Sequence, residues 1–223
     1  ADVVVVGSGP GGLSAAIAAA RAGVSVILIE RFGCFGGNIT SVGVEGFAWY
    51  RHEKTIEAGG LAFEYEQRAI ENNAAVPESQ SKSYELDSEG FKVVADNLVL
   101  KAGVRPMLHR AFCSPILEGN EIRGVITESK AGREAIMGKI IVDATGDADV
   151  ARRSGVKVFK NSKEDMISAS VMFHMSGVNK EEFMDEIKRD PQKYSDWSDK
   201  NWQVQTSGKE DDMFSPFLRK PFE

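Results

Sequence analysis

The sequence predicts an α/β fold built around a parallel sheet, and three observations carry that prediction. Residues 3–6 are four consecutive valines, and a β-branched run of this kind is typical of a strand buried on both faces. An alanine-rich stretch at 15–20 follows, which favours a helix, and Gly23 ends it before a second apolar run at 24–29. A later apolar run at 140–143 leads into small residues. Strand, helix and strand in this order form the repeating unit of a parallel sheet.

The connection between the first strand and the first helix carries the motif Gly7-x-Gly9-x-x-Gly12. Gly7 permits a tight turn, Gly9 lets the backbone approach a pyrophosphate, and Gly12 lets helix and strand pack closely. The unpaired amides and the dipole at the helix start favour bound phosphate. Glu30 ends the second strand, where an acid accepts both hydrogen bonds of an adenosine ribose and repels a 2′-phosphate. The alternative, a glycine-rich turn without a nucleotide, does not account for the strand, helix and acid around the motif.

A second glycine-rich loop follows the acid, with glycines at Gly33, Gly36 and Gly37. Glycines at this spacing let the backbone come close to a ligand. An extended FAD runs along such a loop toward its flavin, so we expect FAD rather than NAD. Thr40 or Ser41 is then expected to hydrogen-bond a phosphate or ribityl oxygen. The alternative is a turn that leads into the next helix.

The middle of the chain predicts helices separated by a polar segment. Apolar residues at helical spacing predict a helix over 61–70, and the polar stretch 74–88 predicts a surface loop or a short edge strand. A second helix is expected over 90–101, capped by Asp87, Ser88 or Glu89 and ended by Gly103. Residues 104–109 then predict the third parallel strand.

Three short strands with turn signals between them predict a β-meander. Runs at 111–117 and 121–128 are joined through Gly119-Asn120, which is a hairpin signal, and a third run covers 134–139. The buried strand at 140–143 follows and leads into a helix over 150–154. We expect Asp147 and Asp149 to cap that helix rather than act as catalytic acids, because Asp is a preferred N-cap residue.

The remaining sequence predicts the start of a second domain. A partly alternating run at 166–175 is expected to open a substrate domain, and Asn179 is expected to cap a charged helix that ends near 189. The polar stretch 190–212 resembles a loop or lid. We therefore expect an FAD-binding Rossmann-type domain over 1–155, with an inserted segment at about 41–90, and a partial substrate or cap domain over 156–223.

Composition excludes several classes of function. The 223 residues are 42% hydrophobic and 27% charged, which is ordinary for a globular protein, and a net charge of −6 gives no basic footprint for nucleic acid. Cys34 and Cys113 form no metal-binding spacing, so we expect no metal. The apolar runs are too short for a membrane span, and we expect a cytoplasmic protein. The last residues close no helix, which suggests part of a longer polypeptide or of a two-chain enzyme.

The ordered motifs resemble those of the FAD-dependent oxidoreductases of the glutathione-reductase-like superfamily. The glycine motif, the acid at the second strand, Gly-Gly-x-x-Thr, the β-meander and Asp-Ala-Thr-Gly-Asp occur in that order. They look most like the group related to fumarate reductase flavoproteins. The resemblance implies non-covalent FAD, because Asn38, Ile39 and Thr40 stand where covalent members carry a histidine. The family's second glycine-rich FAD motif is not visible, so we expect a homo-oligomer or a partner subunit to supply the missing half.

The resemblance also implies which residues contact the cofactor. They are Gly7, Gly9, Pro10, Gly11, Gly12, Glu30, Arg31, Gly36, Gly37, Asn38, Thr40, Ala111, Phe112, Ala144, Thr145, Gly146 and Asp147.

Candidate catalytic residues follow the second glycine loop. In a flavoenzyme the flavin carries the redox step, while protein groups bind substrate and move protons. Arg51 suits a carboxylate substrate, and His52 suits proton transfer near neutral pH. His174 is a further candidate. The alternative is that Arg51 and His52 belong to a solvated charged run.

The leading hypothesis is an FAD-dependent oxidoreductase that transfers hydride or electrons between the flavin and a small organic substrate. One alternative is a flavin-binding electron-transfer subunit that works with a partner polypeptide. Another is a dinucleotide-binding scaffold without turnover.

Overall fold

The computed structural model describes most of the chain up to residue 189. The described residues are 1–44, 46–47, 51–52, 55–56, 59–77, 83–166, 173 and 175–189. The chain divides into two compact units, one of Ala1–Glu78 with Lys82–Met172 and one of Ser79–Ser81 with Phe173–Glu223.

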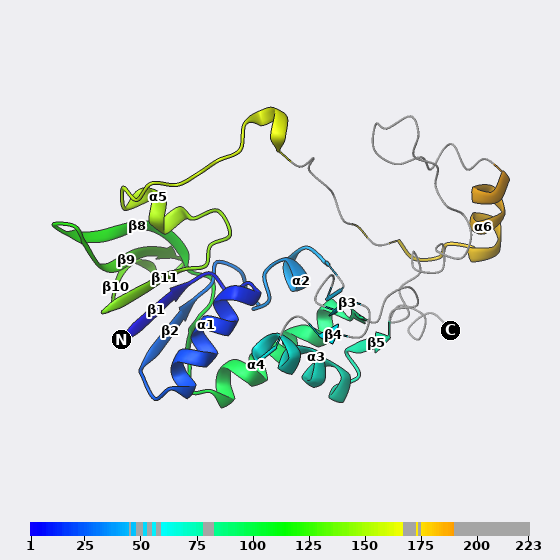
Figure 1. Ribbon diagram of the computed structural model, residues 1–223, viewed down its shortest axis with the longest axis horizontal. Helices are drawn as coiled ribbons and strands as arrows, with labels where there is room; N and C mark the ends of the chain where they lie inside the picture. The colour runs from blue at the N-terminus through cyan, green and yellow to red at the C-terminus, as the bar shows by residue number, and fades with distance from the viewer. Residues whose placement is uncertain are drawn as a thin grey trace. The chain divides into compact units, whose positions relative to one another are not determined.

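The first unit is organised by a four-stranded sheet in the order β11-β1-β2-β7 (Figure 1). Its strands are β11 (Ile140–Asp143), β1 (Val3–Val6), β2 (Val26–Ile29) and β7 (Arg105–Met107). All neighbouring strands are parallel, and β1 is in register with both neighbours, so that Val3 lies opposite Ile140 and Val26. The predicted parallel sheet is therefore confirmed, with a third strand shorter than predicted.

Helices cover one face of this sheet. They are α1 (Pro10–Arg21), α3 (Leu61–Glu71) and α4 (Ser88–Lys101), with the short α2 (Asn38–Ser41) nearby. Val5 and Leu28 face this side and pack in one core with apolar residues of the three long helices. The predicted helices form, and Asp87 caps α4 by accepting from the Glu89 amide at 3.0 Å.

A three-stranded meander covers the other face (Figure 1). Its strands are β8 (Ala111–Glu118), β9 (Glu121–Ser129) and β10 (Gly132–Met137), paired antiparallel in the order β10-β9-β8. Val4 and Val6 point to this side and pack in a second core with Val125 and Ile136. Because successive side chains alternate between faces, the valine run of β1 is buried by helices on one side and by the meander on the other.

The strand at the edge of the sheet departs from its prediction. The sequence predicts a buried strand over 140–143, yet Ile140 is 60% exposed and the other three residues are only half-buried. The reason is position, since β11 is an outer strand of the described sheet while β1 and β2 are inner strands.

The remaining described elements are short. They are β3 (Arg51–His52) paired with β4 (Thr55–Ile56), β5 (Ala75–Pro77) paired with β6 (Tyr84–Leu86), α5 (Asp149–Arg153), a 3₁₀ turn at Lys163–Asp165, and α6 (Lys180–Arg189) in the second unit. Asn179 caps α6 as predicted, because its side chain accepts from the amides of Glu181 and Glu182.

Candidate dinucleotide-binding site

The loop after β1 is built from backbone that lies too close for side chains. Gly7 has φ +96°, and a Cβ there would lie 2.3 Å from the Ala144 carbonyl oxygen. A Cβ on Gly12 would lie 2.0 Å from the carbonyl oxygen of Gly7. These two glycines therefore let α1, β1 and the turn after β11 meet at the carboxyl edge of the sheet.

Gly9 has the opposite surroundings. A Cβ there would meet nothing within 4 Å, so this position opens on free space. Gly9 is also the N-cap of α1, without a side-chain cap, and Pro10 follows it as the first helical residue. The first-turn amides of a helix have no partner within the helix, and with the helix dipole they favour an anion. The space in front of Gly9 thus suits a phosphate group.

The second glycine loop packs directly on the first. The Gly36 amide donates to the Ser8 carbonyl at 2.9 Å, and a Cβ on Gly37 would lie 2.7 Å from the Cα of Gly9. Thr40 is buried, and its hydroxyl donates to the Phe35 carbonyl at 2.6 Å. The hydroxyl predicted to bind the ligand thus holds the loop in this structure, while Asn38 is exposed at the start of α2.

Glu30 lies at the end of β2 and is almost fully buried at 6% exposure. Its Oε2 accepts from the Ser8 amide at 2.9 Å and from the Ser8 hydroxyl at 2.6 Å. Its Oε1 accepts from the Phe32 amide at 2.9 Å. The acid predicted to face a ribose is therefore already bonded to the first glycine loop.

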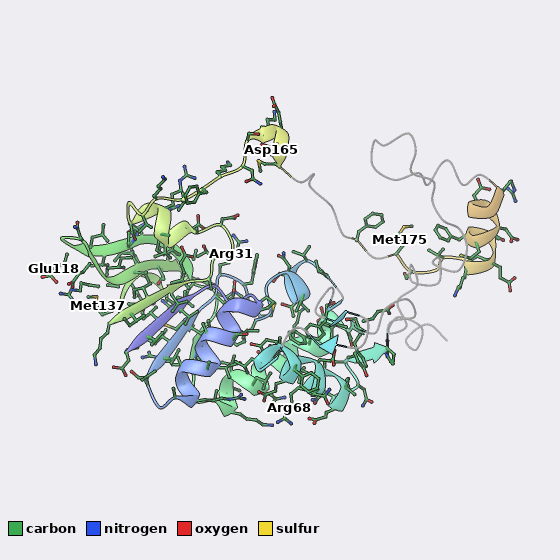
Figure 2. All side chains as sticks on the ribbon, in the orientation of Figure 1. Arg31, Arg68, Glu118, Met137, Asp165 and Met175 are labelled. Carbon is green, nitrogen blue, oxygen red and sulfur yellow. The ribbon has the colours of Figure 1, made fainter. Side chains whose placement is uncertain are left out.

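The connection from β7 to β8 runs beside this acid. The Arg110 amide donates to the Glu30 carbonyl at 2.9 Å, which brings the start of β8 to the end of β2. Ala111 is exposed and Phe112 is half-buried. Arg31 lies beyond the end of β2, exposed, with its guanidinium 4.6 Å from the ring centre of Phe32 (Figure 2). The structure thus brings together the residues predicted to surround an adenosine.

The turn after β11 is held by side chains. Asp143 Oδ1 accepts from the amide and the hydroxyl of Thr145, and its Oδ2 accepts from the Ala151 amide at 2.8 Å. The Thr145 hydroxyl in turn accepts from the Asp149 amide at 2.9 Å. Gly146, with φ +90°, would place a Cβ in open space.

These bonds correct the predicted caps of α5. The N-cap position is Ala148, in the left-handed region with no side-chain cap. Asp147 is not the cap, and Asp149 is a first-turn residue whose own amide is bonded to Thr145. Asp143 and Thr145 satisfy the first amides because they lie at the strand end that faces the helix start.

The candidate catalytic residues are placed only by their backbone. Arg51 and His52 form β3, and their side chains lie outside the described residues, as does His174. Among the described residues, no group of three or more His, Cys, Asp or Glu side chains is arranged to hold a metal. No described helix combines the length and the apolar character needed to cross a bilayer.

A family model described as "FAD dependent oxidoreductase" matches residues 2–221. The chain belongs to the FAD-dependent oxidoreductase family. FAD is accordingly its cofactor, and the residues present fit that group. The open space at Gly9 and the amide-bearing start of α1 suit its pyrophosphate, and Glu30, Arg31, Ala111 and Phe112 lie together at the neighbouring strand ends.

Several known proteins match this FAD-dependent oxidoreductase chain over about 70% of its length. A thiamine thiazole synthase of Saccharolobus islandicus is 32% identical over 168 residues, which cover 70% of this chain and 59% of that protein. The thiamine thiazole synthase of Sulfolobus acidocaldarius is 30% identical over 168 residues, which cover 70% of this chain and 60% of that protein. The matched region thus spans about 59% of the length of these relatives.

Solved structures with low sequence identity share the fold. Thermovibrio ammonificans THI4 matches with a TM-score of 0.51 and 21% identity, over 70% of this chain and 63% of that one. L-proline dehydrogenase from P. horikoshii matches with a TM-score of 0.52 and 14% identity, over 71% of this chain and 57% of that one. These likenesses show a Rossmann-type fold, and the assignment of FAD rests on the family match.

The motif-based prediction missed Ser8, which joins two parts of the site. Ser8 is fully buried and bonded to Glu30, yet it occupies an unspecified position of the glycine motif. The hydroxyl group of Ser8 was the only sign in the sequence that this residue makes a specific bond, because a small apolar residue fits the same position of the glycine motif.

Proposed function

We propose that this chain is the FAD-binding part of an oxidoreductase that transfers hydride or electrons between non-covalent FAD and a small organic substrate. The single observation that supports this best is the packing of the two glycine loops against each other in front of α1. Where two loops meet at glycines, the backbone is left uncovered by side chains, and an extended dinucleotide can approach it closely.

Each group of residues has a proposed role. Gly9 and the first turn of α1 hold the pyrophosphate, and Gly37, Asn38 and Thr40 line the path toward the flavin. Ala144, Thr145, Gly146 and Asp147 lie beside the phosphates. When bound, the flavin supplies the redox chemistry, while Arg51 is proposed to pair with a substrate carboxylate and His52 to move a proton.

The test is the visible absorption spectrum of the protein purified without added cofactor and repeated on the supernatant after acid precipitation. Flavin bands that move to the supernatant support non-covalent FAD. Bands that remain in the pellet overturn the non-covalent assignment. A colourless protein that cannot be reconstituted with FAD overturns the oxidoreductase proposal for this chain.

A second candidate function is synthesis of a thiazole, as named for the Saccharolobus and Sulfolobus relatives. Identity of 32% over 168 residues favours it. Mass spectrometry of small molecules released from the purified protein tests this candidate. A bound thiazole product supports it, and substrate-dependent bleaching of the flavin with no thiazole formed counts against it.

The part played by a further subunit is also a proposal. We propose a flavin site completed by a second copy or a partner polypeptide in a cytoplasmic complex. Flavin reduction by substrate with this chain alone would contradict that requirement. Reduction only after a partner is added would favour the electron-transfer alternative.

A further inference from the structure

Ser8 connects three segments of the cofactor site although its side chain reaches no solvent. Its amide and its hydroxyl both donate to Oε2 of Glu30, at 2.9 and 2.6 Å. Its carbonyl accepts from the Gly36 amide at 2.9 Å. Every polar group of this residue is therefore used, and the first glycine loop is joined to the end of β2 and to the second glycine loop.

The Glu30 carboxylate has little acceptor capacity left. A carboxylate offers about four lone-pair sites, two on each oxygen. Ser8 takes both sites of Oε2, and the Phe32 amide takes one site of Oε1. One site on Oε1 remains, whereas the adenosine ribose of a dinucleotide presents two hydroxyls.

We propose that Ser8 is a positioning residue that fixes the Glu30 carboxylate so that it accepts one ribose hydroxyl instead of two. The inference rests on the proposed FAD function and adds the number of ribose contacts that the acid makes. It replaces the expectation that Glu30 accepts both hydroxyls with a single, testable contact.

The side chain of Ser8 is what makes this arrangement specific. Any residue at position 8 has an amide that reaches Oε2, but only a hydroxyl supplies the second donor. The distance of 2.6 Å is that of a charge-assisted O–H···O⁻ bond. Ser8→Ala keeps both backbone bonds and leaves one lone pair of Oε2 free in a site that is 6% exposed. Without the hydroxyl donor the carboxylate is no longer fixed on Ser8, so it can turn and offer a second acceptor site to the ribose.

The experiment measures the dissociation constants of ADP, 2′-deoxy-ADP and 3′-deoxy-ADP for the flavin-free chain by calorimetry. A hydrogen bond to a charged group contributes enough affinity for its loss to weaken binding by roughly 10- to 100-fold. In the wild type we expect one deoxy analogue to bind at least about tenfold more weakly than ADP, and the other to bind within about twofold of ADP. In Ser8→Ala we expect both analogues to bind about tenfold more weakly than ADP.

Glu30→Gln is the matched control, because it removes the charge and keeps the shape. We expect the discrimination against the sensitive analogue to fall below about threefold in this variant. The proposal is overturned if the wild type binds both deoxy analogues more weakly than ADP by the same factor. It is also overturned if the tolerated analogue stays tolerated in Ser8→Ala, or if Glu30→Gln leaves the discrimination unchanged.

The wild-type pattern decides the number of contacts even where Ser8→Ala does not fold. A wild-type protein that binds neither ADP nor FAD defeats the dinucleotide site itself, and the proposed function with it. A protein that binds FAD without the expected pattern defeats only the role of Ser8.

Discussion

Two turns at the same edge of the sheet each connect a strand to a helix, but different interactions hold them in place. The turn after β1 and the turn after β11 each end a parallel strand and begin a helix. The first has no room for side chains at Gly7 and Gly12. The second is held by the side chains of Asp143 and Thr145.

The difference separates a helix start whose amides can hold an anion from one whose amides are already bonded. Asp143 and Thr145 bond the first amides of α5, so those amides are not available to an anion. Gly9 has no side chain, and the first amides of α1 remain available to a phosphate. The start of α1 therefore suits a ligand because its N-cap Gly9 has no side chain and the space before it is open.

The largest loss of stability is expected when a methyl group is added to the turn after β1. Gly12→Ala should lower the free energy of unfolding by about 3 kcal/mol, because its Cβ meets backbone and forces a shift. The melting temperature should fall by roughly 6–12 °C. Urea denaturation and thermal melting measure both quantities.

Gly9→Ala is the control for this prediction. Its φ of −60° suits alanine and its Cβ meets nothing within 4 Å, so stability should change by less than about 0.5 kcal/mol. FAD affinity should fall, since the methyl group occupies the space before α1. Equal stability losses in Gly9→Ala and Gly12→Ala would contradict the comparison.

The next effect concerns the turn after β11. Asp143→Ala removes the acceptor of three hydrogen bonds and should destabilise the protein by about 2 kcal/mol in urea denaturation. Asp147→Ala, at an exposed position, should change stability by less than about 0.5 kcal/mol. A larger loss in Asp147→Ala would restore Asp147 as the cap.

A smaller loss of stability is expected when the side-chain hydrogen bonds at the start of α1 are removed. Tyr65 on α3 is buried, and its hydroxyl lies 2.9 Å from the Ser14 hydroxyl, which donates to the Pro10 carbonyl at the start of α1. Tyr65→Phe should cost about 1 kcal/mol at neutral pH. A loss above about 3 kcal/mol would mean that side-chain bonds, and not glycines, hold the first turn.

The same tyrosine makes stability depend on alkaline pH. Burial raises the pKa of Tyr65 from 10.0 to about 12, so the folded state favours the neutral phenol. This contribution is complete below pH 10 and is lost as pH rises toward 12. The free energy of unfolding, measured by denaturation at several pH values in this range, should fall more steeply for the wild type than for Tyr65→Phe.

The smallest effect lies at the opposite edge of the sheet. The Lys139 ammonium and the Ser25 hydroxyl bond the Asp2 carboxylate and hold its pKa well below its usual 3.8. Stability from this half-buried group is present above pH 3.8 and is lost as pH falls further. Acid titration should therefore destabilise the wild type more than Asp2→Asn, and high salt should reduce the difference. Equal acid sensitivity would exclude this contribution.

Much of the fold was predictable because it depends on local patterns. The valine run of β1, the alanine-rich α1, the glycine motif and the hairpin signal at Gly119-Asn120 each specify an element from neighbouring residues. The prediction of burial failed where it depended on which strands lie on either side in the sheet. Ile140 is apolar like the valines of β1, but its strand lies at the edge of the described sheet and the residue is exposed.

The sequence by itself determined the dinucleotide motif, the order of strands and helices, and the family resemblance, because spacing and backbone preference are local properties. Only the tertiary structure decided which groups bond across the site. The parallel register of β1 and β2 brings Ser8 to Glu30, and the end of β11 brings Asp143 to the start of α5. Those partners follow from where the sheet places each strand end, and no residue pattern specifies that.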